Sequence, residues 1–409
     1  MTRMVTLGEL IDEYGGFIQT GPFGSQLHQS DYTDFGVPVV MPKDIRDGRI
    51  DKSSVAHISE SKAKELSRHL LKVDTIVLPR RGDVSKRAYI GEEQAGYLCG
   101  TGCAKIEPPT VVVAPKFLYY YLGHSASVQW LEGNAVGTTM LNLSSTIIGR
   151  LPFPMIPIEL QQRIAAILSA YDDLIENNRR RIRLLEEAAR LLYREWFVRL
   201  RFPGHEHVAV VGGVPEGWGR KKISDVCETV GGGTPSTNVA EYWDGEITWV
   251  VPTDVTRNDS LVLLDSERKI TEKGLRESSA RMVPAETILM TSRASVGFFA
   301  LVDRPVCTNQ GFINIIPHQN ELRMYLLFNL MNRVEEIRGN AKGSTYPEIS
   351  KGRFREMDVL IPPARLVDEF GRVATNIIDQ VRSLKRMTLQ LSKARDLLLP
   401  KLMNGELAA

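Results

Sequence analysis

Long apolar segments and cysteines are scarce in this chain of 409 residues. Its longest apolar stretches are short, strand-like pieces such as residues 37–41, far from the roughly 20 apolar residues that a membrane helix needs. No apolar core follows Arg3 near the start of the sequence, so we expect neither a secretory signal nor a membrane span. The four cysteines include one CxxxC pair, Cys99 and Cys103, with no second pair at zinc-ligand spacing. We therefore predict a cytoplasmic protein with buried, unpaired thiols.

The sequence also lacks a strong charge of either sign and the motifs of several enzyme classes. Fifty-one basic and 49 acidic residues give a net charge of +2, far below that of a protein that coats DNA by electrostatics alone. There is no GxxxxGKS/T phosphate loop, no HExxH zinc motif and no zinc-deaminase signature. The segments 60–62 and 267–269 have the ExK form of many nucleases, but neither has a convincing acidic partner upstream. A magnesium-dependent nuclease is therefore a minor alternative, and we predict no catalytic or metal-binding residue.

An internal repeat organises the chain. Similar segments recur in the same order in both halves, namely 7–10 and 223–226, 39–45 and 249–255, 74–78 and 286–290, 133–139 and 339–345, and 151–157 and 357–363. A chance repeat would not keep its order over half a chain, and a period near 206 residues is too long for a solenoid. The sequence therefore predicts an α/β (α+β) protein with two copies of one mixed domain, each followed by a long helix.

Both of these helical segments carry the heptad pattern of a coiled coil. The core positions of the first are Ile164, Leu168, Tyr171, Ile175, Asn178, Ile182, Leu185 and Leu192, and those of the second are Ile377, Val381, Leu384 and Leu391. Steps of four and three keep one stripe facing a partner helix, and a single core Asn commonly fixes the register. We expect the two helices to pair as an antiparallel coiled coil, which would relate the repeats by a pseudo-twofold axis. The alternative is that each helix packs only on its own domain.

These patterns divide the chain into four parts. We predict globular domains at 1–156 and 203–362, a central helix at 157–202 and a C-terminal helix at 363–409 that Pro400 ends. Within the globular domains, short apolar runs bounded by Gly and Pro predict strands at 37–41, 75–78, 247–251 and 288–290. Short helices are predicted at 59–70, 115–122 and 322–337.

Glycine-rich and basic loops supply the candidate binding residues. Glycines in 20–26 and 231–236 let a backbone approach a phosphate or a base closely. The basic loop 79–87 has its counterpart at 291–295, and Arg can pair with guanine edges while Asn and Gln suit adenine. Each loop alone could be an ordinary charged surface, but the recurrence favours DNA. The candidates are Ser25, Gln26, Lys43, Arg80, Arg81, Lys86 and Arg87 in the first domain, and Thr234, Thr253, Arg257, Ser292, Arg293, Asn309 and Gln310 in the second.

The whole chain resembles a specificity subunit of a type I restriction-modification system. The resemblance rests on the duplicated plan and on an ordered set of phrases, namely 20–27 (TGPFGSQL), 157–164 (PIELQQRI), 192–197 (LYREWF), 215–218 (PEGW) and 397–405 (LLLPKLMNG). It implies two target recognition domains that each read one half of a split site in double-stranded DNA. It also implies that the helices set the gap between the half-sites and dock two modification subunits, which are adenine methyltransferases.

The resemblance further implies a restriction subunit that translocates DNA in the full complex. S-adenosylmethionine, ATP and magnesium would belong to these partners, so this chain would hold no cofactor. Because the loops of the two repeats differ, the DNA site should be asymmetric. A helix over 158–198 would be about 60 Å long, which matches about two turns of duplex at 34–36 Å each. The alternatives are a coiled-coil scaffold that binds no DNA and the specificity subunit of a modification-only system.

Overall fold

The computed structural model describes residues 3–137, 141–343, 346–403 and 406–407, so parts of the phrases 133–139, 339–345 and 397–405 lie outside the described residues. The chain forms two compact units. Unit 1 comprises Met1–Leu174 and Leu391–Ala409, and unit 2 comprises Ile175–Gln390. Each unit therefore contains one globular domain, the beginning of the helix that follows it and the end of the helix from the other repeat.

Unit 1 is built on two four-stranded sheets. The first is antiparallel, in the order β2 (Phe17–Thr20), β11 (Cys103–Glu107), β8 (Ile76–Pro79) and β9 (Ala88–Tyr89). The second runs β10 (Leu98–Cys99), β4 (Val37–Val40), β7 (Ala56–Ile58) and β3 (Tyr32–Thr33), with β10 parallel to β4. The other described pairs are β1 (Met4–Thr6) with β12 (Pro152–Pro154) and β5 (Ile45–Arg46) with β6 (Arg49–Ile50). The short helices are α1 (Leu7–Tyr14), α2 (Glu60–Glu65), α3 (Pro115–Leu122), α4 (Ser125–Asn134) and α5 (Ser145–Gly149).

Unit 2 repeats this plan with one more strand. Its larger sheet runs β16 (Cys227–Gly231), β24 (Phe312–Pro317), β21 (Ile288–Thr291), β22 (Phe299–Val302) and β18 (Val262–Leu263). Its smaller sheet runs β19 (Arg268–Ile270), β17 (Trp243–Val250), β23 (Val306–Thr308) and β20 (Met282–Val283). Two ribbons pair β13 (Val210–Val211) with β14 (Val214–Pro215) and β15 (Gly219–Lys222) with β25 (Asp358–Ile361). The short helices are α7 (Ile223–Val226), α8 (Pro252–Thr256), α9 (Glu272–Arg276), α10 (Leu322–Asn332), α11 (Val334–Gly339) and α12 (Lys351–Arg355).

Backbone details confirm the predicted duplication. The order β2, β11, β8, β9 in unit 1 corresponds to β16, β24, β21, β22 in unit 2. Just before β8 and β21, Asp74 and Glu286 both adopt a left-handed backbone, with φ of 67° and 66°. Residues with a Cβ rarely adopt such a φ, so its recurrence at equivalent positions is a specific mark of a shared fold.

The short predicted elements agree with the structure to within a few residues, with two differences. The prediction of a helix at 115–122 matches α3. The stretch 322–337 forms two helices, α10 and α11, that meet at Arg333. The stretch 59–70 forms only a short α2, followed by a 3-10 turn at Ser67–His69.

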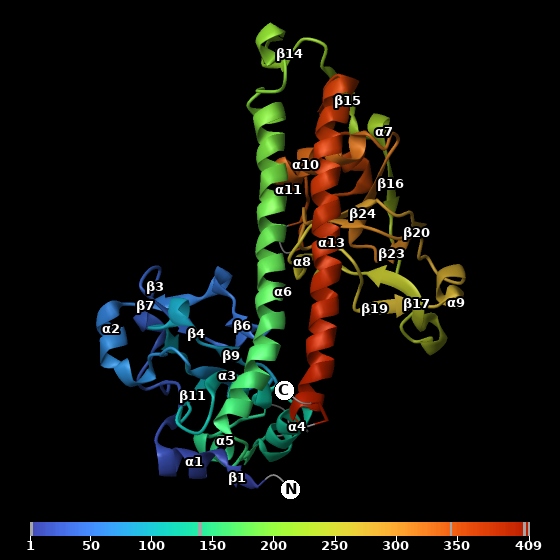
Figure 1. Cartoon of the computed structure of the whole chain (residues 1–409). Helices are drawn as coiled ribbons and strands as arrows, with labels where there is room; N and C mark the ends of the chain where they lie inside the picture. The colour runs from blue at the N-terminus through green and yellow to red at the C-terminus, as the bar shows by residue number, and fades with distance from the viewer. Residues whose placement is uncertain (1–2, 138–140, 344–345, 404–405, 408–409) are drawn as a thin grey trace. The chain divides into compact units, whose positions relative to one another are not determined.

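Two long helices dominate the cartoon in Figure 1, α6 (Ile158–Tyr193) in green and α13 (Ala364–Met403) in red. A π-helical turn, Arg194–Val198, extends α6. The prediction that Pro400 ends the second helix is wrong, because α13 continues to Met403. A proline removes one hydrogen bond and crowds the preceding turn. Here the proline lies in the last turn of the helix, where Leu399 and Leu402 are buried in the core of unit 1.

The two long helices pair with each other in antiparallel fashion. In unit 1, Leu168 near the start of α6 shares a core with Leu402 near the end of α13. In unit 2, Ala189 near the end of α6 shares a core with Ile378 and Val381, which lie in the first half of α13. These contacts confirm the predicted coiled coil and exclude helices that pack only on their own domain.

All the sequence-predicted core positions of the helices lie in buried or half-buried places. The buried ones are Ile164, Leu168, Ile175, Asn178, Ile182, Val381 and Leu384, and the half-buried ones are Tyr171, Leu185, Leu192, Ile377 and Leu391. Toward the end of α6 the buried stripe shifts to Glu186, Ala189 and Tyr193, because a helix of 3.6 residues per turn drifts against a 3.5-residue repeat. Among the described residues, the buried amide nitrogen of Asn178 has no hydrogen-bond partner.

Buried polar side chains hold each globular domain against the helices of its own unit. In unit 2, Glu186 on α6 accepts a hydrogen bond from the backbone N–H of Leu261 at 2.6 Å. Lys385 on α13 donates to the carbonyl of Val262 at 2.9 Å. In unit 1, Gln161 on α6 accepts from the N–H of Ala114 at 3.0 Å. The orientation of each domain on its helices is thus set by directional bonds as well as by apolar packing.

Candidate nucleic-acid interface

In unit 1, several loops meet at one edge of the sheets. The N–H of Gly21 donates to the carbonyl of Cys103, and the N–H of Arg80 donates to the carbonyl of Gly102, both at 2.9 Å. A Cβ at Gly21 would lie 1.9 Å from the carbonyl oxygen of Gly100, so only glycine fits this close approach. The N–H of Gly100 donates to the carbonyl of Val40 at 2.9 Å. We call the four segments that these three bonds join the unit 1 loop edge, which comprises residues 20–26, 40–43, 79–82 and 100–103.

Unit 2 builds an equivalent edge with different residues. The N–H of Ser292 donates to the carbonyl of Gly311 at 2.8 Å, as Arg80 does to Gly102 in unit 1. The N–H of Gly233 donates to the carbonyl of Thr308 at 2.9 Å. The N–H of Asn309 donates to the carbonyl of Val250 at 3.0 Å. The unit 2 loop edge therefore comprises residues 231–235, 250–253, 291–295 and 308–311.

An arginine occupies the same place on both loop edges. Arg81 is followed by Gly82 with φ of 81°, and Arg293 is followed by Ala294 with φ of 60°. The left-handed residue turns the chain sharply, and it costs an L-residue with a Cβ about 1–2 kcal/mol. Both arginine side chains are exposed. Arg293 lies 3.6 Å from the carboxylate of Glu348, whereas no carboxylate in the described chain lies within ion-pair distance of Arg81.

The remaining unit 1 candidates divide into exposed residues and residues held internally. Ser25 and Lys86 are exposed, and Lys86 lies 3.5 Å from Asp83. Lys43 is exposed, but its amine donates to the carbonyl of Ser54 at 2.6 Å.

Three unit 1 candidates are engaged inside the unit. Gln26 accepts from the N–H of its own turn at Phe23. Arg80 is only 9% exposed and donates to Asn142 at 3.3 Å. Arg87 donates to the carbonyl of Tyr119 at 2.6 Å, and burial lowers the pKa of its guanidinium. We therefore leave Arg87 out of the surface proposed below.

The unit 2 candidates show the same division. Thr253, Arg257, Arg293 and Gln310 are exposed, and Thr234 hydrogen-bonds to the side chain of Gln310. The side chain of Ser292 is only 3% exposed. Asn309 accepts from the N–H of Gly311 at 2.9 Å, so it stabilises its own turn.

Residues that the candidate set omits also lie on these edges. Phe23 is 58% exposed, and its ring lies under the guanidinium of Arg80 at 5.9 Å. Asn142 holds Arg80 from a segment 62 residues away in the chain. Tyr346 of unit 2 is 71% exposed. The position of Phe23 in a Gly-Pro-Phe-Gly turn could have indicated a binding residue, because exposed aromatic rings can stack on bases. The residues next to Asn142 in the sequence give no such indication of its role.

The lysines of both ExK segments lie in ion pairs with neighbouring carboxylates. Lys62 pairs with Glu65 at 3.0 Å, and Lys269 lies 3.4 Å from Asp265. Within the described ranges, no group of three or more His, Cys, Asp or Glu residues is placed to hold a metal ion. All four cysteines are free and buried, and burial raises the pKa of Cys227 to about 12. None of the helices described for this chain is both long and apolar enough to cross a membrane.

Two stretches of the chain, residues 13–187 and 215–383, match the family described as the type I restriction modification DNA specificity domain. The chain belongs to this family. Each matched stretch contains most of one globular domain and a large part of the long helix that follows it, so this specificity-domain protein carries its family signature twice.

Relatives of known type extend this assignment. The chain is 35% identical over 200 residues to the type I restriction enzyme MjaIX specificity subunit of Methanocaldococcus jannaschii, a match that covers 48% of this chain and 46% of that subunit, about half its length. It is 22% identical over 432 aligned residues to the type I restriction enzyme HindI specificity subunit of Haemophilus influenzae, a match that covers 89% of this chain and 94% of that subunit. The crystal structure of the S subunit of the type I restriction-modification system of M. genitalium shares the fold, with a TM-score of 0.57 and 18% sequence identity. That match covers 98% of this chain and 96% of the S subunit.

Proposed function

We propose that this chain is the DNA-recognition subunit of a type I restriction-modification complex and catalyses no reaction itself. Each loop edge reads one half of a bipartite site in double-stranded DNA. The observation that carries this proposal is a shared loop frame with different side chains, since Arg80-Arg81-Gly82 of unit 1 stands where unit 2 has Ser292-Arg293-Ala294. Two readers with one frame and different contact residues bind different half-sites, so the recognised sequence is asymmetric.

The exposed residues of each edge suit the chemistry of DNA. The guanidinium of Arg81 or Arg293 can donate two hydrogen bonds to the O6 and N7 atoms of a guanine. Lys86 and Arg257, which follow the edge segments 79–82 and 250–253 in the chain, are exposed cations that can neutralise phosphates. The ring of Phe23 can stack on an unpaired base. Because the net charge is only +2, the chain alone binds DNA weakly and with a strong dependence on salt.

We propose that the helix pair sets the gap between half-sites and docks the modification subunits. Leu184 and Leu191 on α6 and Val198 on its π-helical extension recur every seven residues and are 62%, 48% and 50% exposed. This stripe is separate from the buried positions Ile182 and Ala189 that face α13. An exposed apolar stripe at heptad spacing fits one further helix, and a helix of a modification subunit is the occupant that the family assignment favours.

The partners supply the chemistry in this proposal. Two adenine methyltransferase subunits hold S-adenosylmethionine, and a restriction subunit holds ATP and magnesium. In a modification-only system the restriction subunit is missing, while the role of this chain is unchanged.

Co-expression with the modification subunit tests the proposal. The pair is produced in a host that has no other adenine methyltransferase, and methylated adenines are mapped across the host DNA. A split, asymmetric motif supports the proposal and gives both half-sites. A stable, methylation-competent complex that leaves no split motif refutes it and favours the scaffold alternative.

A further inference from the structure

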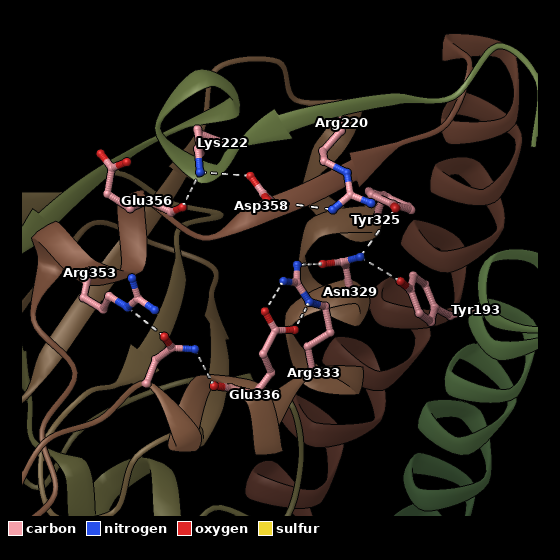
Figure 2. Close-up of polar contacts among 11 residues, drawn as sticks. Tyr193, Arg220, Lys222, Tyr325, Asn329, Arg333, Glu336, Arg353, Glu356 and Asp358 are labelled. Carbon is pink, nitrogen blue, oxygen red and sulfur yellow. Dashed lines mark hydrogen bonds and ion pairs between the residues drawn. The ribbon is translucent and has the colours of Figure 1, made fainter. Parts of the chain in front are cut away.

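A polar pocket of about 550 Å³ lies in unit 2, away from the residues that define its loop edge. Its walls come from the β15–β25 ribbon, from α10 and α11, and from α12, as Figure 2 shows. Seven charged residues from these separate segments line it, namely Arg220, Lys222, Arg333, Glu336, Arg353, Glu356 and Asp358.

Positive charge is in excess in this pocket. Asp358 is shared by two cations, Lys222 at 3.0 Å and Arg220 at 3.8 Å. Arg353 donates to the amide oxygen of Asn340 at 2.7 Å, and no carboxylate in the described part of the chain lies within ion-pair distance of it.

The third carboxylate of the lining does not reduce this excess. The side chain of Glu356 points away from the other charged groups in Figure 2, and it is only its backbone carbonyl that accepts from Lys222. Of the groups that face one another, Arg333 is paired with Glu336 at 2.7 Å. Of the remaining three cations, Lys222 and Arg220 share the carboxylate of Asp358, which leaves Arg353 as the cation whose charge is not balanced by a carboxylate of the described lining.

The pocket is rigidly connected to the helix pair. Arg333 donates to the side-chain oxygen of Asn329 at 3.3 Å, and the amide of Asn329 donates to the hydroxyl of Tyr193 at 3.0 Å. Tyr193 belongs to α6 and is 4% exposed. The hydrogen bonds from Arg333 hold the pKa of Glu336 below its usual range, so this pair stays charged at neutral pH. A ligand would thus meet a preformed site rather than mobile side chains.

The charges of this pocket are absent from the other repeat. The ribbon of β1 and β12 in unit 1 corresponds to that of β15 and β25, with Thr6 opposite Pro152 where unit 2 has Lys222 opposite Asp358. At the positions equivalent to the charged residues other than Glu356, unit 1 has Met4, Thr6, Ser127, Trp130, Ile147 and Pro152. The two repeats share their fold and their loop frame, so this pocket is a feature by which a partner can tell unit 2 from unit 1.

We infer that the pocket binds an acidic peptide segment of a partner protein and anchors that partner on unit 2 only. Arginines pair with carboxylates through two parallel hydrogen bonds, and Arg353 has such donors to offer. The backbone N–H groups of a peptide can donate to the carboxylates of Glu336 and Asp358, which a fully ionised phosphate, with acceptor oxygens alone, cannot do. The pocket adjoins the start of α13, since β25 ends at Ile361 and α13 begins at Ala364.

This inference rests on the proposed function for the identity of the partner. If two modification subunits dock on the helix pair, the one on unit 2 has an anchor that the one on unit 1 lacks. The two docking steps are then unequal, and a complex with one modification subunit forms first at unit 2.

A direct binding experiment tests the pocket. The full chain is titrated with a fluorescent hexaglutamate peptide, acetylated and amidated at its ends, at low salt. Arg353→Glu should weaken binding by about tenfold or more, and Arg353→Ala should weaken it less. The matched control is Arg276→Glu, the same charge change at an exposed arginine of α9, which should leave binding unchanged.

Folding is not at risk in the test variant. Arg353 is exposed and lies three residues after the capping residue Ser350, a place where glutamate favours a helix. If the wild-type chain does not bind the peptide, or if Arg353→Glu and Arg276→Glu bind it equally, the inference is wrong. Competition by an equal concentration of inorganic phosphate or of a DNA duplex would also overturn it, in favour of a phosphate site.

Native mass spectrometry of the co-expressed complex tests the asymmetry. The wild-type chain and Arg276→Glu should carry two modification subunits, whereas Arg353→Glu should accumulate with one. Equal occupancy in all three contradicts the inference while the methylation motif still supports the proposed function. Conversely, if the chain binds hexaglutamate but directs no split methylation motif, the inference about the pocket stands and the proposed function is refuted.

Discussion

Removing the side chain of Glu186 should loosen the second recognition domain from the helix pair. This carboxylate is 4% exposed and accepts from the buried N–H of Leu261 at 2.6 Å. In Glu186→Ala that N–H has no acceptor, and an unsatisfied buried donor costs about 1–3 kcal/mol. Glu186→Gln keeps an acceptor oxygen and loses the attraction of the carboxylate to Lys385 and to the half-exposed Arg190. The 3.5 Å contact with Arg190 is worth about 0–1 kcal/mol. We therefore expect the alanine variant to be less stable than the glutamine variant by about 1–2 kcal/mol.

Amide hydrogen exchange measures this effect where it arises. In Glu186→Ala, the amides of residues 258–263 should exchange about fivefold to thirtyfold faster than in the wild-type chain, as a loss of about 1–2 kcal/mol implies. In Glu186→Gln they should exchange at close to the wild-type rate. Urea unfolding followed by tryptophan fluorescence gives the matching change in the free energy of unfolding. Unchanged exchange at 258–263 in the alanine variant would refute the reasoning.

The same pair of variants has a pH signature. Burial raises the pKa of Glu186 above its ordinary value of 4.5, so the folded chain holds this proton at a higher pH than the unfolded chain does. The contribution of Glu186 to stability therefore falls as the pH rises from about 4.5 through the raised pKa, and the loss persists above it. Relative to Glu186→Gln, the wild-type chain should be more stable at pH 5 than at pH 7, and a difference that is flat with pH would contradict this.

Three further predictions concern recognition, spacing and docking. Arg81→Ala should reduce discrimination at one half-site and Arg293→Ala at the other, measured as methylation rates on duplexes with single substitutions; equal loss at both half-sites counts against separate readers. Seven residues inserted at matched places in α6 and α13 should lengthen the helix pair by about 10 Å. The gap between the half-sites in the mapped motif should then grow by about three base pairs at 3.4 Å each, and an unchanged gap in a folded variant would show that the helices do not set it. Leu191→Lys should weaken binding of the modification subunit about tenfold or more, because a buried leucine is worth about 1.5–3 kcal/mol. The control is Met282→Lys, the same kind of change at an exposed apolar residue of β20, and equal affinities of the two variants would place the docking surface elsewhere.

The sequence predicted the fold better than it predicted the candidate site. The heptad steps through Ile164, Leu168 and Ile175 indicate a partner helix because periodicity is a local property of the chain. The ordered repeat likewise predicts two equivalent domains. By contrast, Arg80 and Ser292 belong to loops of the predicted kind, yet one is tied to Asn142 and the other is buried.

The failures have a common physical cause. Whether a loop side chain points outward depends on backbone torsions and on partners that lie far away in the chain, such as Asn142 for Arg80. Pro400 was read as a helix end from its own chemistry, but Leu399 and Leu402 beside it are buried in a core that contains residues from the other end of the chain. Local patterns contain no record of such contacts.

By itself, the sequence determined the duplication, the mixed α/β class, the pairing of two long helices and the family resemblance, because order and periodicity are written along the chain. Only the tertiary structure decided that Arg81 and Arg293 occupy equivalent outward positions, and that seven charged residues from distant segments line one pocket in unit 2. Contacts between residues far apart in the chain create both features, and the energy of a charged group depends on which partners those contacts bring within reach.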